Sequence, residues 1–119
     1  MPNIIFKGNA LSTNNIYRFH QYTMYMTKAG SAIKERYQWD AKSQWKKEIM
    51  YGRIEMYAKL YFGDKRKRDI DNYNKLLLDS MSGIVYIDDK QIEKLTVEKL
   101  YDKENPRIEV EIKRYGKSK

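Results

Sequence analysis

The sequence predicts a single small α+β domain in which two helices pack on a mixed or antiparallel sheet. Three observations support this prediction. Apolar residues recur at helical spacing in two segments, polar and apolar residues alternate in other segments, and the elements follow the order β-α-β-α-β-β. A chain of 119 residues that is 41% hydrophobic can build one core but is too short for two. Residues 1–119 are therefore expected to form one domain.

The first part of the chain is predicted to hold one strand and one long helix. NIIFKG at residues 3–8 indicates a short strand, and the polar run after it favours an irregular loop over residues 9–27. A helix is expected from residue 28 to about residue 50, with Thr27 as its candidate N-cap and Gly52 just beyond its end. The apolar residues at helical spacing are Ala29, Ala32, Ile33, Tyr37, Ala41 and Trp45.

The second part is predicted to contain a strand, a helix and two more strands. Residues 53–62 alternate almost strictly between polar and apolar side chains, which is typical of a half-buried strand. A helix is expected from about residue 70 to residue 82, closed by Gly83. Residues 92–101 and 107–113 alternate again, and the basic tail at residues 114–119 is expected to fray. The predicted buried stripe of the second helix contains Ile70, Tyr73, Leu76, Leu77, Met81 and Ile84.

The composition favours an intracellular protein with an anionic partner. The net charge is +8, and residues 1–34 contain no acidic residue. Tyrosine and phenylalanine rings alternate with cations between residues 17 and 25, a pattern that suits stacked bases and phosphates but also fits an ordinary polar loop. There is no secretory signal and no apolar run of about 20 residues, so a cytoplasmic location is expected. The absence of cysteine excludes disulfides and thiolate metal sites.

A run of cations leads directly into two carboxylates at residues 65–71, KRKRDID. A structural interpretation is available: Asp69 caps the following helix, and Asp71 pairs with Lys75 four residues later. On this view the neighbouring arginines only neutralise acidic side chains. A functional interpretation is that the strand-to-helix junction holds the carboxylates in a fixed geometry. For this stretch taken alone, both interpretations remain open.

A second acidic pair, Asp88-Asp89, favours the functional interpretation. Together with Asp69 and Asp71 it offers hard oxygen ligands, which suit Mg²⁺ or Mn²⁺. Such an ion can polarise a phosphate and activate water while nearby cations hold the nucleic-acid backbone. An EF-hand is excluded because its third ligand position is Tyr73 and its final glutamate is replaced by Ser80. With one histidine in the chain, histidine-based triads are not expected.

KRKRDIDNYNK, followed by YIDDKQI, resembles the RusA family of Holliday junction resolvases. An N-terminal element of that family is echoed by LSTNNIY at residues 11–17, although Ala10 and Leu11 stand where the family has two prolines. The resemblance implies that Asp69, Asp71 and Asp89 are catalytic metal ligands and that Lys75 takes part in catalysis. Asp88 is expected to support the ligands. The candidate DNA contacts are Lys65, Arg66, Lys67, Arg68, Asn14, Asn15, Tyr17 and Arg18.

The resemblance further implies a homodimer of phage or prophage origin with one Mg²⁺ site per subunit (Mn²⁺ being the alternative ion). Such an enzyme makes paired nicks across a four-way DNA junction in recombination and repair. Two alternatives remain open. The first is a basic nucleic-acid-binding module without catalysis, such as a phage regulator. The second is a nuclease that acts mainly on other branched DNA.

Overall fold

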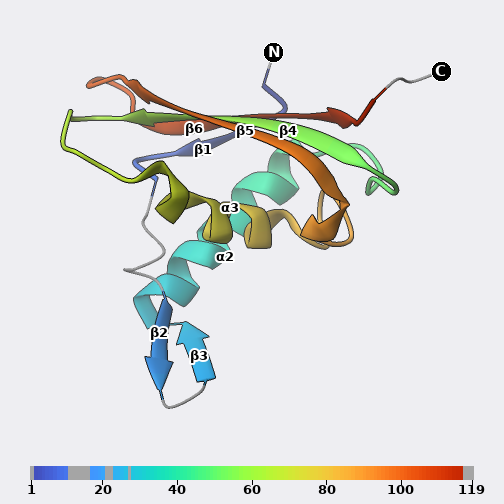
Figure 1. The fold of residues 1–119 in the computed structure, drawn as a ribbon, viewed down its shortest axis with the longest axis horizontal. Helices are drawn as coiled ribbons and strands as arrows, with labels where there is room; N and C mark the ends of the chain where they lie inside the picture. Colours follow the sequence, from blue (N-terminus) through green and yellow to red (C-terminus); the bar gives the residue numbers. More distant parts are fainter. Residues whose placement is uncertain (1, 11–16, 21–22, 27, 117–119) are drawn as a thin grey trace.

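A four-stranded mixed sheet forms one layer of the protein, and the helices pack on one of its faces (Figure 1). The computed structural model describes residues 2–10, 17–20, 23–26 and 28–116. The strand order is β1-β6-β4-β5, in which β6 is antiparallel to both of its neighbours and β4 is parallel to β5. The strands of this sheet are β1 Ile4–Lys7, β4 Ile54–Phe62, β5 Ile92–Tyr101 and β6 Arg107–Arg114, and the α-helices are α2 Lys28–Gln44 and α3 Asn74–Met81.

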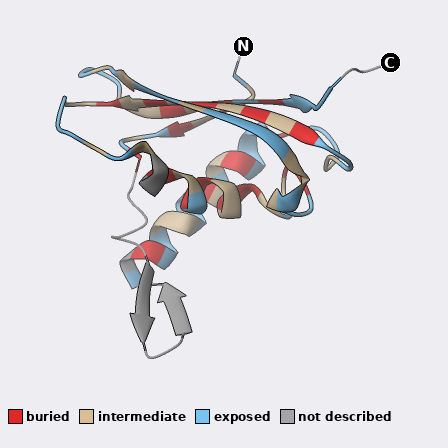
Figure 2. Ribbon diagram, in the orientation of Figure 1, coloured by how far each residue is buried: buried red, intermediate tan, exposed pale blue. Residues whose placement is uncertain are grey.

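The predicted fold class is confirmed, including the order β-α-β-α-β-β and the mixed sheet. Its clearest sequence signal, the alternation in β4, corresponds to a strand whose odd-numbered side chains lie half-buried while the even-numbered ones are buried under the helices (Figure 2). The residues expected on the buried side of the second helix pack as predicted: Tyr73, Leu76, Leu77 and Met81 are buried, and Ile70 and Ile84 are partly buried against the core.

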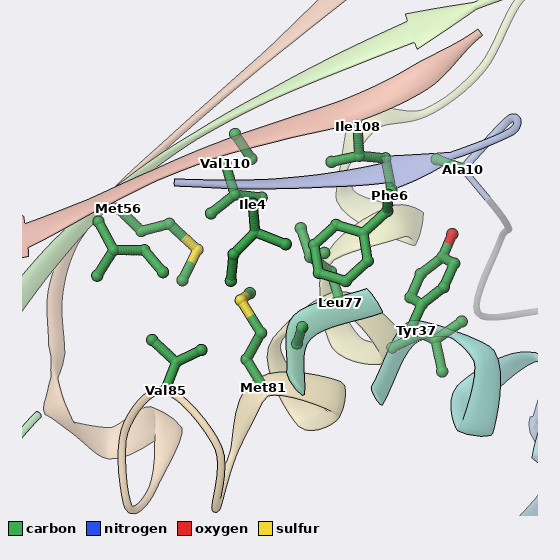
Figure 3. Close-up of a cluster of buried hydrophobic side chains, with 14 of the residues drawn as sticks. Ile4, Phe6, Ala10, Tyr37, Met56, Leu77, Met81, Val85, Ile108 and Val110 are labelled. Carbon is green, nitrogen blue, oxygen red and sulfur yellow. The ribbon is translucent and has the colours of Figure 1, made fainter. Parts of the chain in front are cut away.

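The core lies between the sheet and the helices (Figure 3). Ile4 and Phe6 on β1 meet Val110 and Ile108 on β6, and the ring of Phe6 packs against Tyr37 of α2 with ring centroids 5.1 Å apart. Burial of large apolar side chains stabilises the fold by about 1.5–3 kcal/mol each. This shared core fixes α3, and with it the candidate site, against the sheet.

Three predicted elements differ from the structure. The segment expected to be an irregular loop contains a short antiparallel hairpin, β2 Tyr17–His20 and β3 Thr23–Met26. Helix α2 ends at Gln44 instead of near residue 50, and Met50 lies outside it, where it donates its N–H to the carbonyl of Val85 at 2.8 Å. The second helix begins as a 3₁₀ turn, η1 Ile70–Tyr73, before α3.

The C-terminal segment is ordered further than the sequence predicts. β6 includes Arg114, and the N–H of Tyr115 donates to the carbonyl of Arg53 at 3.0 Å, so the chain is anchored past the start of the predicted tail. Thr27 and residues 117–119 lie outside the described residues. None of the helices in the described part of the chain is long and apolar enough to cross a membrane.

Candidate functional site

The cationic loop, residues 65–68, follows the C-terminal end of β4. Some of its side chains are anchored to the domain and others are exposed. The guanidinium of Arg68 pairs with Asp64, with Nη2 2.8 Å from Oδ1, and lies 4.2 Å from the centroid of the Phe62 ring. Its side chain is only 15% exposed. A backbone N–H donated by Arg66, followed by the contact with Arg68, holds the pKa of Asp64 below its usual range. Arg68 therefore fastens the loop to the domain, while Lys65 and Lys67 are exposed to solvent.

Asp69 lines the same depression as Lys99, a cation on strand β5. Lys99 of β5 donates from Nζ to the carbonyl of Arg68 at 2.7 Å, and Lys67, Arg68, Asp69 and Lys99 together line an open depression. Asp69 is exposed and occupies the N-cap position of η1, yet its side chain makes no capping hydrogen bond. The interpretation of Asp69 as a helix cap is therefore not supported, and the residue instead lines a depression with three cations.

The Asp88-Asp89 turn is a short 3₁₀ turn, η2 Asp89–Gln91, with Asp88 as its N-cap. The Asp88 carboxylate accepts from the N–H of Lys90 at 2.9 Å. Gln91 ties the turn to the rest of the protein through four hydrogen bonds. Its Oε1 accepts from the N–H groups of residues 87 and 88 at 2.8 and 3.0 Å, and its Nε2 donates to the carbonyls of residues 50 and 52 at 3.0 and 2.9 Å.

Asp89 lies in a small electrostatic cluster with Lys75 and Asp79 of α3. Partial burial raises the pKa of Asp89, and the neighbouring carboxylates of Asp88 and Asp79 raise it further, whereas Lys75 acts in the opposite direction. Lys75 is held in turn by Asp79, with Nζ 3.2 Å from Oδ2 across one turn of the helix. Crowded carboxylates of this kind are relieved by a bound cation. The donor types therefore fit a divalent metal ion.

The structure brings some of the predicted site residues together. Lys75 and Asp89 share one cluster, with Asp88 next to them. Asp69 directly precedes η1, which leads into α3, and lines a depression with Lys67, Arg68 and Lys99. The side chain of Asp71, on η1, lies outside the described residues. Among the side chains that are described, no three acidic or histidine groups lie close enough to hold one metal ion.

The N-terminal DNA-contact candidates are only partly described. Tyr17 and Arg18 belong to β2 as far as the backbone is concerned, but their side chains lie outside the described residues. Asn14 and Asn15 are not described at all. Their proposed contacts with DNA therefore stay predictions.

Sequence reasoning missed three residues that the site uses. Asp79 is not among the predicted site residues, although its spacing of four from Lys75 is a sufficient signal for the ion pair. Gln91 gave no signal, because its partners at residues 50 and 52 are about 40 positions away in the chain. Lys99 likewise reaches Arg68 over 31 positions, and only the sheet brings the two together.

Comparison with known proteins places these features in a family. The family described as Endodeoxyribonuclease RusA matches residues 8–113. A segment of 47 residues is 45% identical to the uncharacterized protein YqaN of Bacillus subtilis, which corresponds to 40% of this chain and 32% of that protein. The match thus spans about a third of the length of that curated relative.

Proposed function

The chain belongs to the RusA family of endodeoxyribonucleases, and from this membership we propose a divalent-metal-dependent nuclease that resolves four-way DNA junctions by paired nicks. The observation that carries the proposal is the cluster of Lys75, Asp79 and Asp89 on and beside the helix that follows the RDID segment. Asp88 caps η2 and Asp79 pairs with Lys75, but neither role requires a third, half-buried carboxylate at Asp89. A bound cation would relieve the repulsion among the three.

Each residue has a defined task in this proposal. Asp69, Asp71 and Asp89 hold Mg²⁺ or Mn²⁺, which when bound polarises a phosphate and lowers the pKa of a coordinated water. Lys75 neutralises charge on the phosphate while Asp79 orients its ammonium group. Asp88 caps the turn that carries Asp89.

DNA binding is assigned to the exposed cations of the loop and the sheet. Lys65 and Lys67 are exposed beside the depression that Asp69 and Lys99 line, and these lysines meet phosphates of the DNA backbone. Arg68 serves mainly as an anchor, because its guanidinium is already engaged by Asp64 and Phe62. The enzyme acts as a cytoplasmic homodimer, since two identical sites suit two symmetric cuts.

Cleavage assays on three labelled DNAs test the function. We expect the protein to nick a synthetic four-way junction at two symmetric positions in Mg²⁺, and to act much less on a fork or on linear duplex. Chelation with EDTA should stop cleavage, and Asp71→Asn should still bind the junction without cutting it.

The outcomes separate the alternatives. Cleavage by Asp71→Asn at the wild-type rate would show that the metal assignment is wrong. Binding without cleavage by the wild-type protein, in both Mg²⁺ and Mn²⁺, would identify a binding module. Preferential cutting of the fork would identify a nuclease for other branched DNA.

The role of Asp79 is testable separately. Asp79→Asn is expected to lower kcat by about tenfold to a hundredfold with little change in junction affinity, because a misplaced Lys75 affects the chemical step more than binding. Asp79→Glu should recover part of the rate by restoring the charge. Glu35→Gln on the exposed face of α2 is the control and should cut normally. Equal kcat for Asp79→Asn and wild type would refute the positioning role.

A further inference from the structure

Strand β5 forms an open edge of the sheet. It pairs with β4 on one side, and in the described part of the chain no strand pairs with its other side. β5 is ten residues long, and most of its side chains are exposed, as the pale blue strand in Figure 2 shows. Leu95 and Tyr101 are among the exposed large hydrophobic residues. A long edge with free N–H and C=O groups is a template for pairing with another strand.

The sequence of β5 is self-complementary about Thr96. Reading outwards from that residue, the first neighbours Leu95 and Val97 are both apolar, and the second neighbours Lys94 and Glu98 carry opposite charges. The β4–β5 register shifts at Glu93, so the regular part of β5 begins at Lys94. Two copies of this strand running antiparallel with Thr96 facing Thr96 thus match from Lys94 to Glu98.

We propose that β5 pairs antiparallel with β5 of a second copy of this chain, with Thr96 on the two-fold axis, to form one continuous eight-stranded sheet. The proposal rests on the proposed function for its homodimer and adds the surface and the register. Opposite charges facing each other across two strands stabilise the pair, and like charges destabilise it.

The register follows from symmetry as well as charge. A two-fold axis that joins two antiparallel edges is perpendicular to the sheet, so facing residues must lie on the same face and differ by an even number. Lys94, Thr96 and Glu98 share the helix-free face, because their partners on β4 are Glu55, Tyr57 and Lys59. Moving the axis to Leu95 or Val97 would place Lys94 opposite Thr96 or Leu100, and the charge matches would be lost.

Glu98 lies on the face of the sheet that this register requires. The hydroxyl of Tyr57 on β4 donates to its carboxylate, which fixes the side chain on the helix-free face of the sheet. Lys94 is exposed on the same face. In the dimer each Lys94 meets the partner copy's Glu98, so the arrangement provides two ion pairs related by the axis.

The proposed dimer places both candidate sites on the same side of the joined sheet. An axis perpendicular to the sheet leaves the helices of both copies on the same side, as the single helical layer in Figure 1 makes clear. η2 leads directly into β5, and η1 contacts it. The two candidate sites therefore open on one common face, where a single branched DNA can reach both.

Charge reversal tests the ion pairs in DNA-free and metal-free protein. In a dimer of Lys94→Glu, two glutamates face each other at both symmetry-related positions. In a dimer of Glu98→Lys, two lysines face each other at both positions. Each single variant is expected to raise the dimer Kd, measured by sedimentation equilibrium, by at least about tenfold. The double variant Lys94→Glu/Glu98→Lys should return the Kd to within a few-fold of wild type. A monomeric wild type, or a double variant as weak as the singles, overturns the proposal.

Cross-linking tests the register, and the chain contains no cysteine of its own. Thr96→Cys is expected to form a covalent dimer rapidly on mild oxidation, because facing Cα atoms in an antiparallel pair lie about 4.5 or 5.5 Å apart, within reach of a disulfide. Lys94→Cys on the same face is the control, since its two copies lie ~13 Å apart along the strands. If Thr96→Cys forms no dimer faster than Lys94→Cys, the register is wrong.

The two proposals fail separately. A Thr96→Cys dimer that never cuts a junction would overturn the function and leave the interface standing. A protein that cuts junctions as a dimer, but is indifferent to these substitutions, would keep the function and place the interface elsewhere.

Discussion

Replacing Asp89 by asparagine should reduce junction cleavage by at least about a hundredfold while leaving junction binding intact. Even residues that only support metal ligands typically cost 10- to 100-fold when mutated, so loss of a direct ligand is expected to cost no less. Binding is expected to persist because the exposed lysines of the cationic loop are untouched. A gel-shift assay and a cleavage assay on the same labelled junction measure the two effects.

The same substitution should not weaken the metal-free fold. The pKa of Asp89 is raised by burial and by neighbouring carboxylates, so its ionised form is less favourable in the folded protein than in the unfolded chain. Stability contributed by protonated Asp89 is present at acidic pH and lost as pH rises through the raised pKa. Asp89→Asn should therefore unfold at the same or a higher temperature than wild type at neutral pH, and this advantage should vanish in acid.

Asp88 provides the matched control for this pair of effects. Asp88→Ala removes the cap of η2 and should cost about 1 kcal/mol of stability, whereas Asp88→Asn keeps a good capping residue. Loss of stability with Asp89→Asn, or normal cleavage by that variant, would contradict the assignment of Asp89.

Replacing Gln91 by alanine should give the largest loss of stability for a partly exposed side chain. The change removes four hydrogen bonds that link η2 to residues 50 and 52 and to the turn before it. At roughly 0.5–1.5 kcal/mol per bond, with one end of the network exposed, we expect a loss of about 2–3 kcal/mol in the free energy of unfolding. Urea unfolding followed by circular dichroism measures it.

Cleavage should fall along with stability in Gln91→Ala, because Asp89 sits on the same turn. Gln91→Glu keeps the acceptor oxygen but sets a carboxylate against two carbonyls, so it should be no more stable than the alanine variant. Lys90→Ala, at the exposed neighbouring position, should change stability by less than about 0.5 kcal/mol. If Gln91→Ala behaves like Lys90→Ala, the turn does not depend on this side chain.

The fold was largely predictable because its signals are local. Alternation in residues 54–62 and the apolar stripe of the second helix reflect which side chains face the core, and both were recovered. The end of α2 was not predictable in the same way. Beyond that end, the N–H of Met50 pairs with the carbonyl of Val85, 35 positions later, a partner that no local pattern indicates.

The candidate site was predictable in kind but not in arrangement. The RDID segment and the Asp88-Asp89 turn supply the candidate carboxylates, whose role as metal ligands stays a prediction. The spacing of four relates Asp79 to Lys75, but nothing local indicated that this pair would lie next to Asp89, or that Lys99 of β5 would line a depression with Asp69.

The strands of the main sheet, the two helices, the cationic loop, the candidate carboxylates and the family follow from the sequence, because each depends on neighbouring residues or on a short motif, whereas the β2–β3 hairpin does not. The tertiary structure alone decided that β4 and β5 run parallel, so that α3 crosses back between them and carries Lys75 towards Asp89. It also left β5 at the edge of the sheet, where its self-complementary charges become available to a partner. Local periodicity reports how a segment buries its own face, whereas the choice of neighbours depends on packing the whole chain around one core.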